Sequence, residues 1–337
     1  MPGKLTDVAR QARVSEATVS RVLNGKPGVS EATRAAVLTA LDVIGYERPT
    51  QLRSRRARMV GLVVPELGNP IFPAPAEVVS GALAQGGFNA VLCTRTGSMS
   101  EAEYVEMLLE RQVSGMIFAG GQYAEAEAPH DHYTRLKQLR LPVVLVNAAA
   151  EHLDFPRVST DDAVAMEQAY AHLTSLGHER IGLVLGPRDH VPSARKLDAF
   201  DRLSAASADE LVERTRFSIE GGHAAAAKLL ARGVTGIVCA SDPLALGAIR
   251  AARRSGLAVP ADVSVVGYDD SALMACTDPP LTTVRQPIDA IGRAAVEMLV
   301  GQIEGSAVAP DELFFEPEIV ARGSTATAVP RAVLAQV

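Results

Sequence analysis

From Val60 onward the sequence alternates between short apolar runs and longer alanine-rich stretches. Seven runs have the composition of buried strands: residues 60–64, 89–93, 115–119, 143–147, 181–185, 236–240 and 263–268. Helical patterns fill several intervals between them, at 101–112, 162–176, 221–232 and 243–256. Continuous apolar strands separated by helices are typical of parallel sheets covered on both faces. The spacing resets between Asn147 and Ile181, so we predict two similar α/β lobes that bind ligands at the carboxyl ends of their strands.

The first 45 residues follow a different pattern, with three short helices in place of strands. Thr6 is predicted to cap a helix over 7–13, and Ser15 a second helix that ends near Leu23. Ser30 is predicted to cap a third helix that stops at Gly45. Helices this short bury little alone, so we expect them to pack on one another as an all-α unit. Residues 46–59 are basic, lack apolar periodicity and are predicted to be a linker.

Charge is distributed unevenly between these regions. Residues 1–58 hold eleven lysines and arginines against five acids, whereas the remainder holds 22 against 34. A basic head on an acidic body favours a polyanion as the partner of the head alone. A merely solvated basic arm is the alternative interpretation.

Residues 6–23 fit a helix–turn–helix with a turn at Arg13 and Val14. Apolar positions on one side leave another face for solvent, formed by Ser15, Glu16, Ala17, Ser20 and Arg21. Hydroxyls at a helix start suit phosphate, and residues one turn later reach base edges in a major groove. An amphipathic surface helix without a DNA role explains the same pattern.

The segment TDVARQARVSEATVSRVLNGKPGVSEATRAAVLTALDVIGYERP closely resembles the head of the lactose/galactose repressor (LacI) family. GLVVP, LGHERIGLV, SDPLALGAI, VPADVSVVGYDD, PPLTTVRQP and VARGSTA resemble later segments of that family in the same order. The resemblance covers residues 5–325. It implies a homodimeric transcription regulator, expected to be a repressor, that binds near-palindromic double-stranded operator DNA and a small effector.

The same resemblance implies the domain organisation. The headpiece would span residues 1–48, a hinge linker 49–59, an effector-binding core 60–325 and a tail 326–337. The core would resemble a periplasmic sugar-binding protein, with Rossmann-like lobes. Its N-lobe would combine 60–158 with 287–316, and its C-lobe 159–286 with 317–325.

Candidate DNA-binding residues are carried over from the family by position. Glu16, Ala17 and Arg21 match base-reading positions. Glu16 accepts from a cytosine amine, or it repels phosphate, or it pairs with Arg21. The complete set is Thr6, Ser15, Glu16, Ala17, Thr18, Ser20, Arg21, Asn24, Ser30, Thr33, Arg34, Leu52 and Arg53. The hinge is about three residues shorter than the family pattern, with Leu52 at the place of a minor-groove wedge. Loss of operator affinity without loss of nonspecific affinity in Leu52→Ala would identify that wedge.

Candidate effector-binding residues come from the same comparison: Ile71, Phe72, Asn147, Arg195, Lys196, Phe217, Asp242 and Asp269. Lys196 replaces a family arginine and lacks its bidentate fork, for which Arg195 is expected to compensate. Phe72 and Phe217 are alternatively plain core aromatics, and Asp242 alternatively caps the helix that begins at Pro243. A set rich in acids and amides suits a neutral, hydroxyl-rich ligand such as a sugar.

Other classes of function find less support. The chain lacks the phosphate-binding, nucleophile-elbow and zinc-protease motifs of common enzymes, so we expect neither catalysis nor a cofactor. The pair His130 and His132 is interpreted as part of a solvated loop and not as a metal site. A transport-type sugar-binding protein is the alternative function, against which the headpiece and the missing export signal argue. Three scattered cysteines and no apolar run of 18 residues favour a cytoplasmic protein without membrane contact.

Overall fold

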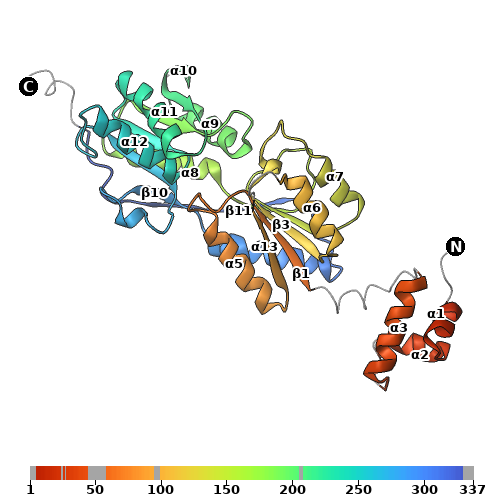
Figure 1. Cartoon of the computed structure of the whole chain (residues 1–337). Coiled ribbons are helices and arrows are strands. Elements are labelled where there is room, and N and C mark those ends of the chain that lie inside the picture. Colours follow the sequence, from red (N-terminus) through yellow and green to blue (C-terminus); the bar gives the residue numbers. More distant parts are fainter. Residues whose placement is uncertain are drawn as a thin grey trace, which may run out of the picture. The chain divides into compact units, whose positions relative to one another are not determined.

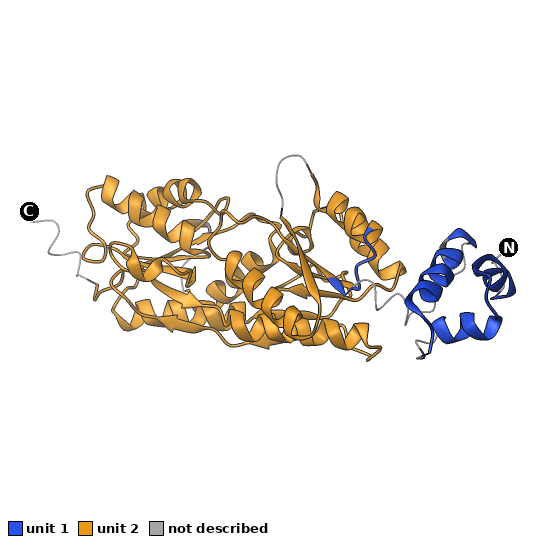
Figure 2. Cartoon of the chain, turned by 60° about the horizontal axis from the view of Figure 1, so that its bottom comes forward, with its two compact units in different colours: residues 1–59, 111–114 blue, residues 60–110, 115–337 orange. Residues whose placement is uncertain are grey.

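The computed structural model describes residues 5–23, 26, 28–44, 58–94, 99–204 and 208–328. The chain divides into two units, one formed by residues 1–59 with 111–114 and one by residues 60–110 with 115–337 (Figure 2). Each unit encloses apolar cores of its own. The predicted combination of an all-α headpiece with an α/β core is therefore correct.

The described part of the first unit contains three helices: α1 (Leu5–Ala12), α2 (Glu16–Leu23) and α3 (Glu31–Ile44). Val8, Val19 and Val37, one from each helix, are fully buried in their shared core. The predicted caps of the second and third helices are confirmed. The backbone N–H of Thr18 donates to Ser15 Oγ, and that of Thr33 donates to Ser30 Oγ, both at 3.2 Å.

The predicted start of the first helix is wrong. Helix α1 begins at Leu5, so Thr6 lies inside its first turn and does not precede it as a cap. The turn after α1 is where the sequence predicts it. Arg13 adopts a φ of 54°, and the N–H of Val14 donates to the carbonyl of Ala9 at 3.0 Å, which closes the helix end.

The second unit contains two six-stranded sheets, each the centre of a lobe (Figure 1). In the first lobe the strand order is β11-β5-β4-β3-β1-β2. These strands are β1 (Met59–Val64), β2 (Asn89–Thr94), β3 (Gly115–Ala119), β4 (Val143–Val146), β5 (Arg157–Thr160) and β11 (Glu312–Phe315). Its helices are α5 (Pro73–Gln85), α6 (Glu101–Glu110), α7 (Asp131–Gln138) and α13 (Ile288–Ile303), with a 3-10 turn at Gln122–Ala124.

The sheet of the second lobe has the order β12-β10-β9-β8-β6-β7. Its strands are β6 (Ile181–Leu185), β7 (Val212–Arg214), β8 (Gly236–Cys239), β9 (Ser264–Asp269), β10 (Thr282–Arg285) and β12 (Glu318–Val320). Its helices are α8 (Asp162–Ser175), α9 (Val191–Leu203), α10 (Ala208–Leu211), α11 (Ile219–Ala231) and α12 (Asp242–Arg254), with a 3-10 turn at Met274–Cys276. Strand β12 runs antiparallel to β10, while β10, β9, β8, β6 and β7 pair in parallel.

The chain crosses between the lobes three times, at residue 161, at 286–287 and at 316–317. The C-terminal segment consequently supplies one edge strand to each sheet, β11 to the first and β12 to the second. These crossovers place the carboxyl ends of strands from both lobes around one space, the arrangement in which parallel α/β sheets bind ligands.

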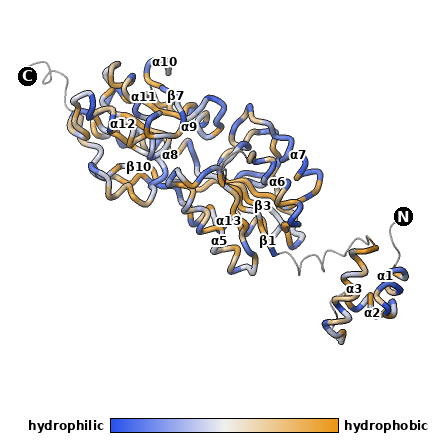
Figure 3. Tube along the Cα trace, in the orientation of Figure 1, coloured by the Kyte–Doolittle hydropathy of each residue, from blue (hydrophilic) through white to orange (hydrophobic). Residues whose placement is uncertain are grey.

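Apolar residues concentrate on the strands, as the orange colour of β1 and β3 shows (Figure 3). All five residues of β3 and of β6 are buried, as expected for parallel strands with both faces covered. Among the described residues, no helix combines the length and apolar character needed to cross a bilayer.

Candidate functional site

A cavity of about 380 Å³ lies between the two lobes of the second unit. Its lining includes residues that follow strands directly: Asn147 after β4 and Ser241 near the end of β8, with Asp269 closing β9. Other polar and aromatic lining residues include Glu66, Asn69, Ser100, Glu101, Tyr104, Gln122, Tyr123, Glu125, Asp162, His190, Tyr268 and Gln286. A volume of this size is typical of small-molecule sites in proteins.

The structure brings six of the eight predicted effector residues to this cavity. Ile71, Phe72 and Asn147 line it from the first lobe, and Lys196, Phe217 and Asp269 line it from the second. Arg195 and Asp242 are absent from the lining.

Lys196 lies at the second-lobe wall of the cavity and is 4% exposed. Its ammonium group donates a short hydrogen bond to Asp162 Oδ1 and sits 4.0 Å from the centroid of the Tyr268 ring. Burial raises the pKa of Asp162, although the charge of Lys196 opposes that shift. Asp162 thus occupies part of the hydrogen-bonding capacity of Lys196 and fixes where the remaining N–H groups point.

Asp162 was not predicted as a site residue. The sequence offers a weak signal for it, because two aspartates, Asp161 and Asp162, follow the short run 157–160. In the structure Asp161 caps α8 by accepting from the N–H groups of Ala163 and Val164 at 3.0 and 3.1 Å. The carboxylate of Asp162, one position later, is left for the cavity.

Asp269 lies at the end of β9, is 6% exposed and accepts from Gln286 Nε2 at 2.7 Å. Burial, reinforced by the nearby charge of Asp242, raises the pKa of Asp269 well above its ordinary value. The backbone of Asp269 has a φ of 117°, and that of Asn147, at the end of β4, has a φ of 77°. Left-handed backbones at non-glycine residues are costly and cluster at ligand sites, which is consistent with both residues aiming into the cavity.

The two predicted aromatics are half-buried and line the cavity, and Phe217 also packs against the core of the second lobe. Phe217 packs against the His190 ring with centroids 5.0 Å apart and an interplanar angle of 70°. Gly186 allows this position, because a Cβ there would lie 2.3 Å from Phe217 Cζ. Burial lowers the pKa of His190 to about 3, so the imidazole beside Phe217 is neutral.

Arg195 takes a different part from the one expected. It does not compensate for Lys196 in the cavity, because both terminal nitrogens of its guanidinium donate to the carboxylate of Glu312, each at 2.7 Å. Glu312 belongs to strand β11 of the first lobe, so this ion pair joins the lobes.

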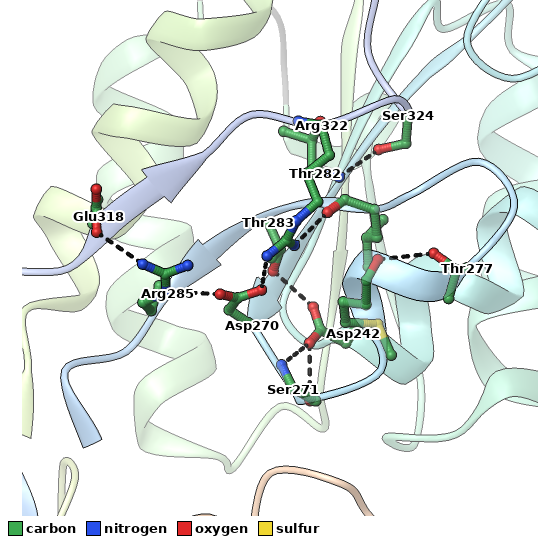
Figure 4. Close-up of polar contacts among 12 residues, drawn as sticks. Asp242, Asp270, Ser271, Thr277, Thr282, Thr283, Arg285, Glu318, Arg322 and Ser324 are labelled. Atoms are coloured by element: carbon green, nitrogen blue, oxygen red, sulfur yellow. Dashed lines mark hydrogen bonds and ion pairs between the residues drawn. The ribbon is translucent and has the colours of Figure 1, made fainter. Parts of the chain in front are cut away.

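Asp242 is fully buried and its acceptors are occupied (Figure 4). Oδ2 accepts from the N–H and the hydroxyl of Ser271, at 2.7 and 2.9 Å, and Oδ1 accepts from Thr283 Oγ1 at 2.7 Å. Burial raises the pKa of Asp242 to about 6, although these hydrogen bonds lower it. The alternative role as a helix cap is also not found, because Ser241 is the cap of α12 and Asp242 is its first residue. Asp242 therefore joins the segment that follows β9, through Ser271, to strand β10, through Thr283.

The interpretation of His130 and His132 as part of a solvated loop is wrong. Both side chains are buried, and α7 begins at Asp131 between them. His132 Nε2 lies 3.0 Å from Oε1 of Glu101, and the N–H of Gln122 donates to Oε2 at 3.1 Å. Glu101 also lines the cavity, and no sequence motif marks it. Within the described ranges, no group of three or more histidine, cysteine or acidic side chains is arranged to hold a metal ion.

On the first unit, α2 presents the face that the sequence predicts for DNA. Ser15, Glu16, Ala17 and Arg21 are exposed, whereas Val19 and the apolar residues Val22 and Leu23 are buried. Among the other candidates, Thr6 and Ser30 are exposed, and Thr18, Ser20, Thr33 and Arg34 are half-buried. Asn24, Leu52 and Arg53 lie outside the described residues.

Family models match both parts of the chain. Residues 4–49 match the bacterial regulatory proteins of the lacI family, and residues 170–325 match a periplasmic binding protein-like domain.

Relatives of known name match the chain over nearly its full length. The HTH-type transcriptional regulator MalR of Streptomyces coelicolor is 53% identical over 97% of this chain and 98% of its own. The transcriptional repressor CytR of Escherichia coli is 32% identical over 95% of this chain and 96% of its own.

Solved structures give the same result. The complex of the transcriptional regulator CelR with cellobiose covers 96% of this chain and 99% of its own, with 32% identity and a TM-score of 0.72. The structure of the lac repressor dimer bound to operator and an anti-inducer covers 97% of this chain and 100% of its own, with 28% identity and a TM-score of 0.70.

Proposed function

Since the chain belongs to the lacI family of bacterial regulatory proteins, we propose that it is a repressor whose affinity for operator DNA is controlled by a neutral sugar. Its relatives over the full length are transcription regulators, so the chain is a DNA-binding regulator and not an enzyme. A transport-type binding protein would leave the three-helix unit and its exposed α2 face without a role.

The observation that carries the sugar proposal is the charge of the cavity wall. Acidic side chains outnumber cations among its lining residues. Glu66, Glu101 and Glu125 are joined by Asp162, which pairs with the cation Lys196, and by Asp269, whose pKa burial raises. Such a wall repels phosphorylated or acidic ligands and offers acceptors for hydroxyl groups. Phe72 and Phe217 add apolar surface on either side. The cellobiose complex of CelR and a ribose-bound lacI-family regulator from Enterococcus faecium support a sugar by similarity.

We propose that the candidate DNA-binding residues predicted from the sequence contact the operator. Two chains would present their α2 helices to successive major grooves of a near-palindromic site, as the operator-bound dimer of the lac repressor supports by similarity. An effector between the lobes would alter their relative angle and through it the affinity for DNA, with a coupling of about 1–3 kcal/mol.

Selection of bound duplexes from a random pool by the full-length protein tests the DNA half of the proposal. A near-palindromic consensus is expected, and its affinity should exceed that for random DNA by about 10³-fold or more at physiological salt. Enrichment of no consensus would overturn the DNA half.

Titration of that duplex in the presence of cellobiose, maltose and ribose tests the effector half. Glucose 6-phosphate serves as the matched charged ligand. We expect one of the neutral sugars to change operator affinity and the phosphorylated sugar to have no effect. A response to the phosphorylated sugar alone would contradict the argument from the acidic wall.

A further inference from the structure

Helix α9 carries two neighbouring cations with separate partners. Lys196 is directed at the cavity and pairs with Asp162 of its own lobe. Arg195 extends from the same helix to the other lobe, where Nη1 donates to Oε1 and Nη2 to Oε2 of Glu312, each at 2.7 Å. Helix α9 and strand β11, which carries Glu312, belong to different lobes (Figure 1). The pair is bidentate, the strongest geometry for an arginine and a carboxylate.

The surroundings of this ion pair shield it from water. The side chain of Glu312 is 8% exposed and that of Arg195 is 30% exposed. The Arg195 guanidinium also lies 5.6 Å from the centroid of the Phe314 ring, a second contact with the first lobe. The hydrogen bonds to Glu312 raise the pKa of Arg195. Burial alone would raise the pKa of Glu312, but the hydrogen bonds and the charge of Arg195 lower it overall. Both partners therefore stay charged at neutral pH, and salt screens them less than a surface pair.

The ion pair between Arg195 and Glu312 influences the cavity because it links the two lobes that enclose it. The lobes are joined covalently by three crossovers, at 161, 286–287 and 316–317, about which they can turn. The ion pair holds α9 to the edge strand of the first lobe. A backbone contact, from the N–H of Ala126 to the carbonyl of Asp189 at 2.7 Å, joins the lobes near the cavity wall. A ligand that touches both walls requires the arrangement that these contacts stabilise.

We infer that Arg195 is a positioning residue for the effector site: through Glu312 it holds the two lobes in the arrangement in which Lys196 faces a cavity closed from both sides. The inference rests on the proposed function, because it concerns the same cavity. When the pair is removed, the binding-competent arrangement becomes a smaller fraction of the population. The apparent dissociation constant of the effector then rises by the inverse of that fraction.

The test compares Arg195→Met, Glu312→Gln and the double variant in the full-length protein. Calorimetric titration with cellobiose and maltose should give a dissociation constant raised about fivefold or more in each single variant. The double variant should bind sugar no more weakly than the single variant with the lower affinity, because the two residues act through each other. Arg195→Lys, which keeps the charge and loses the fork, should give an intermediate value.

Small-angle X-ray scattering without any sugar reports the lobe arrangement directly. The single variants are expected to scatter as more open particles than the wild type, and saturating sugar should restore the wild-type curve. A purely structural role for Arg195 would lower the thermal unfolding midpoint and leave this curve unchanged.

Arg157→Met is the matched control, since Arg157 Nε lies 3.8 Å from the same carboxylate but belongs to the same lobe as Glu312. The scattering curve of this variant should match that of the wild type, and its dissociation constant for sugar should stay within about twofold of the wild-type value. The inference is overturned if Arg195→Met behaves like Arg157→Met, or if the single effects add in the double variant. If the wild type binds neither cellobiose nor maltose, these two sugars are excluded as effectors, and the scattering experiment still decides whether the pair holds the lobes.

Discussion

Lys196 and Asp162 form a buried ion pair in the wall of the interlobe cavity, with each side chain 5% exposed. A buried pair of this kind costs desolvation energy for both ions, so it is weak evidence for a purely stabilising role. Its position beside Tyr268 and in the cavity lining points to ligand recognition.

The first prediction separates stability from recognition at this pair. Lys196→Met should destabilise the fold by about 3 kcal/mol, because it leaves the Asp162 carboxylate buried without its cation. Combining it with Asp162→Asn should recover most of that stability, since no buried charge remains. The sugar affinity should stay low in both variants. Denaturant unfolding and calorimetric titration measure the two quantities, and recovery of affinity in the double variant would contradict a ligand-binding role for Lys196.

The second prediction concerns the exposed face of α2. Arg21→Ala should weaken binding to the selected operator by about 1–3 kcal/mol and relax specificity at one base position. Arg10→Ala serves as a control, because Arg10 is exposed on α1 and pairs with Asp7 at 3.6 Å. We expect that control to affect operator and random DNA equally. Fluorescence anisotropy with both duplexes measures the difference, and an equal loss on both in Arg21→Ala would argue for a phosphate contact.

The third prediction uses the close approach of Gly186 to Phe217. A Cβ at Gly186 would lie 2.3 Å from Cζ and 2.5 Å from Cε2 of Phe217, so Gly186→Ala should push the ring out of position. We expect sugar affinity to fall about tenfold while the protein stays folded. Gly81→Ala is the matched control, since nothing lies within 4 Å of a Cβ there. It should leave sugar binding unchanged and raise stability by about 0.5–1 kcal/mol, because Gly81 is inside helix α5.

The fourth prediction is a pH dependence that originates at His190. Burial lowers its pKa from 6.5 to about 3, so the unfolded chain takes up a proton below pH 6.5 and the folded protein does not. Stability from this residue is therefore present above pH 6.5 and is lost as the pH falls towards 3. Between pH 6.5 and pH 5 the loss should be about 1.5 kcal/mol.

Urea unfolding of the wild type and of His190→Gln at these two pH values checks this expectation. The variant should lose less stability on acidification, by about that 1.5 kcal/mol. Parallel losses in both proteins would show that other groups control the acid response.

Long apolar runs predict strands β1, β2, β3, β4, β6, β8 and β9. Strands β1, β3 and β6 fall within one residue of the predicted ranges, because four or more consecutive buried residues leave a strong local signal. The same pattern does not predict β5, β7, β10, β11 and β12. Strand β10 reads TTVR, and its buried Thr282 and Thr283 are polar, so only pairing with β9 and β12 makes it a strand.

The candidate site divides in the same way. Positions such as Asp269 follow an obvious strand, so their approach to the cavity could be predicted. The partner of Arg195 is Glu312, which is 117 residues away in sequence, so the local pattern SARKLDAF does not predict this contact. Glu101 was missed for a related reason, because its donors His132 and Gln122 come from other elements.

The C-terminal segment supplies one edge strand to each sheet, and this has a consequence for biosynthesis. Residues 312–320 give the first sheet its β11 edge and the second sheet its β12 edge. A nascent chain that has not yet emerged past Val320 therefore has neither sheet complete, however long its earlier segments have been outside the ribosome. Both lobes receive their last strand from the same short segment, so termination of the chain upstream of Glu312 leaves both sheets without an edge strand at once.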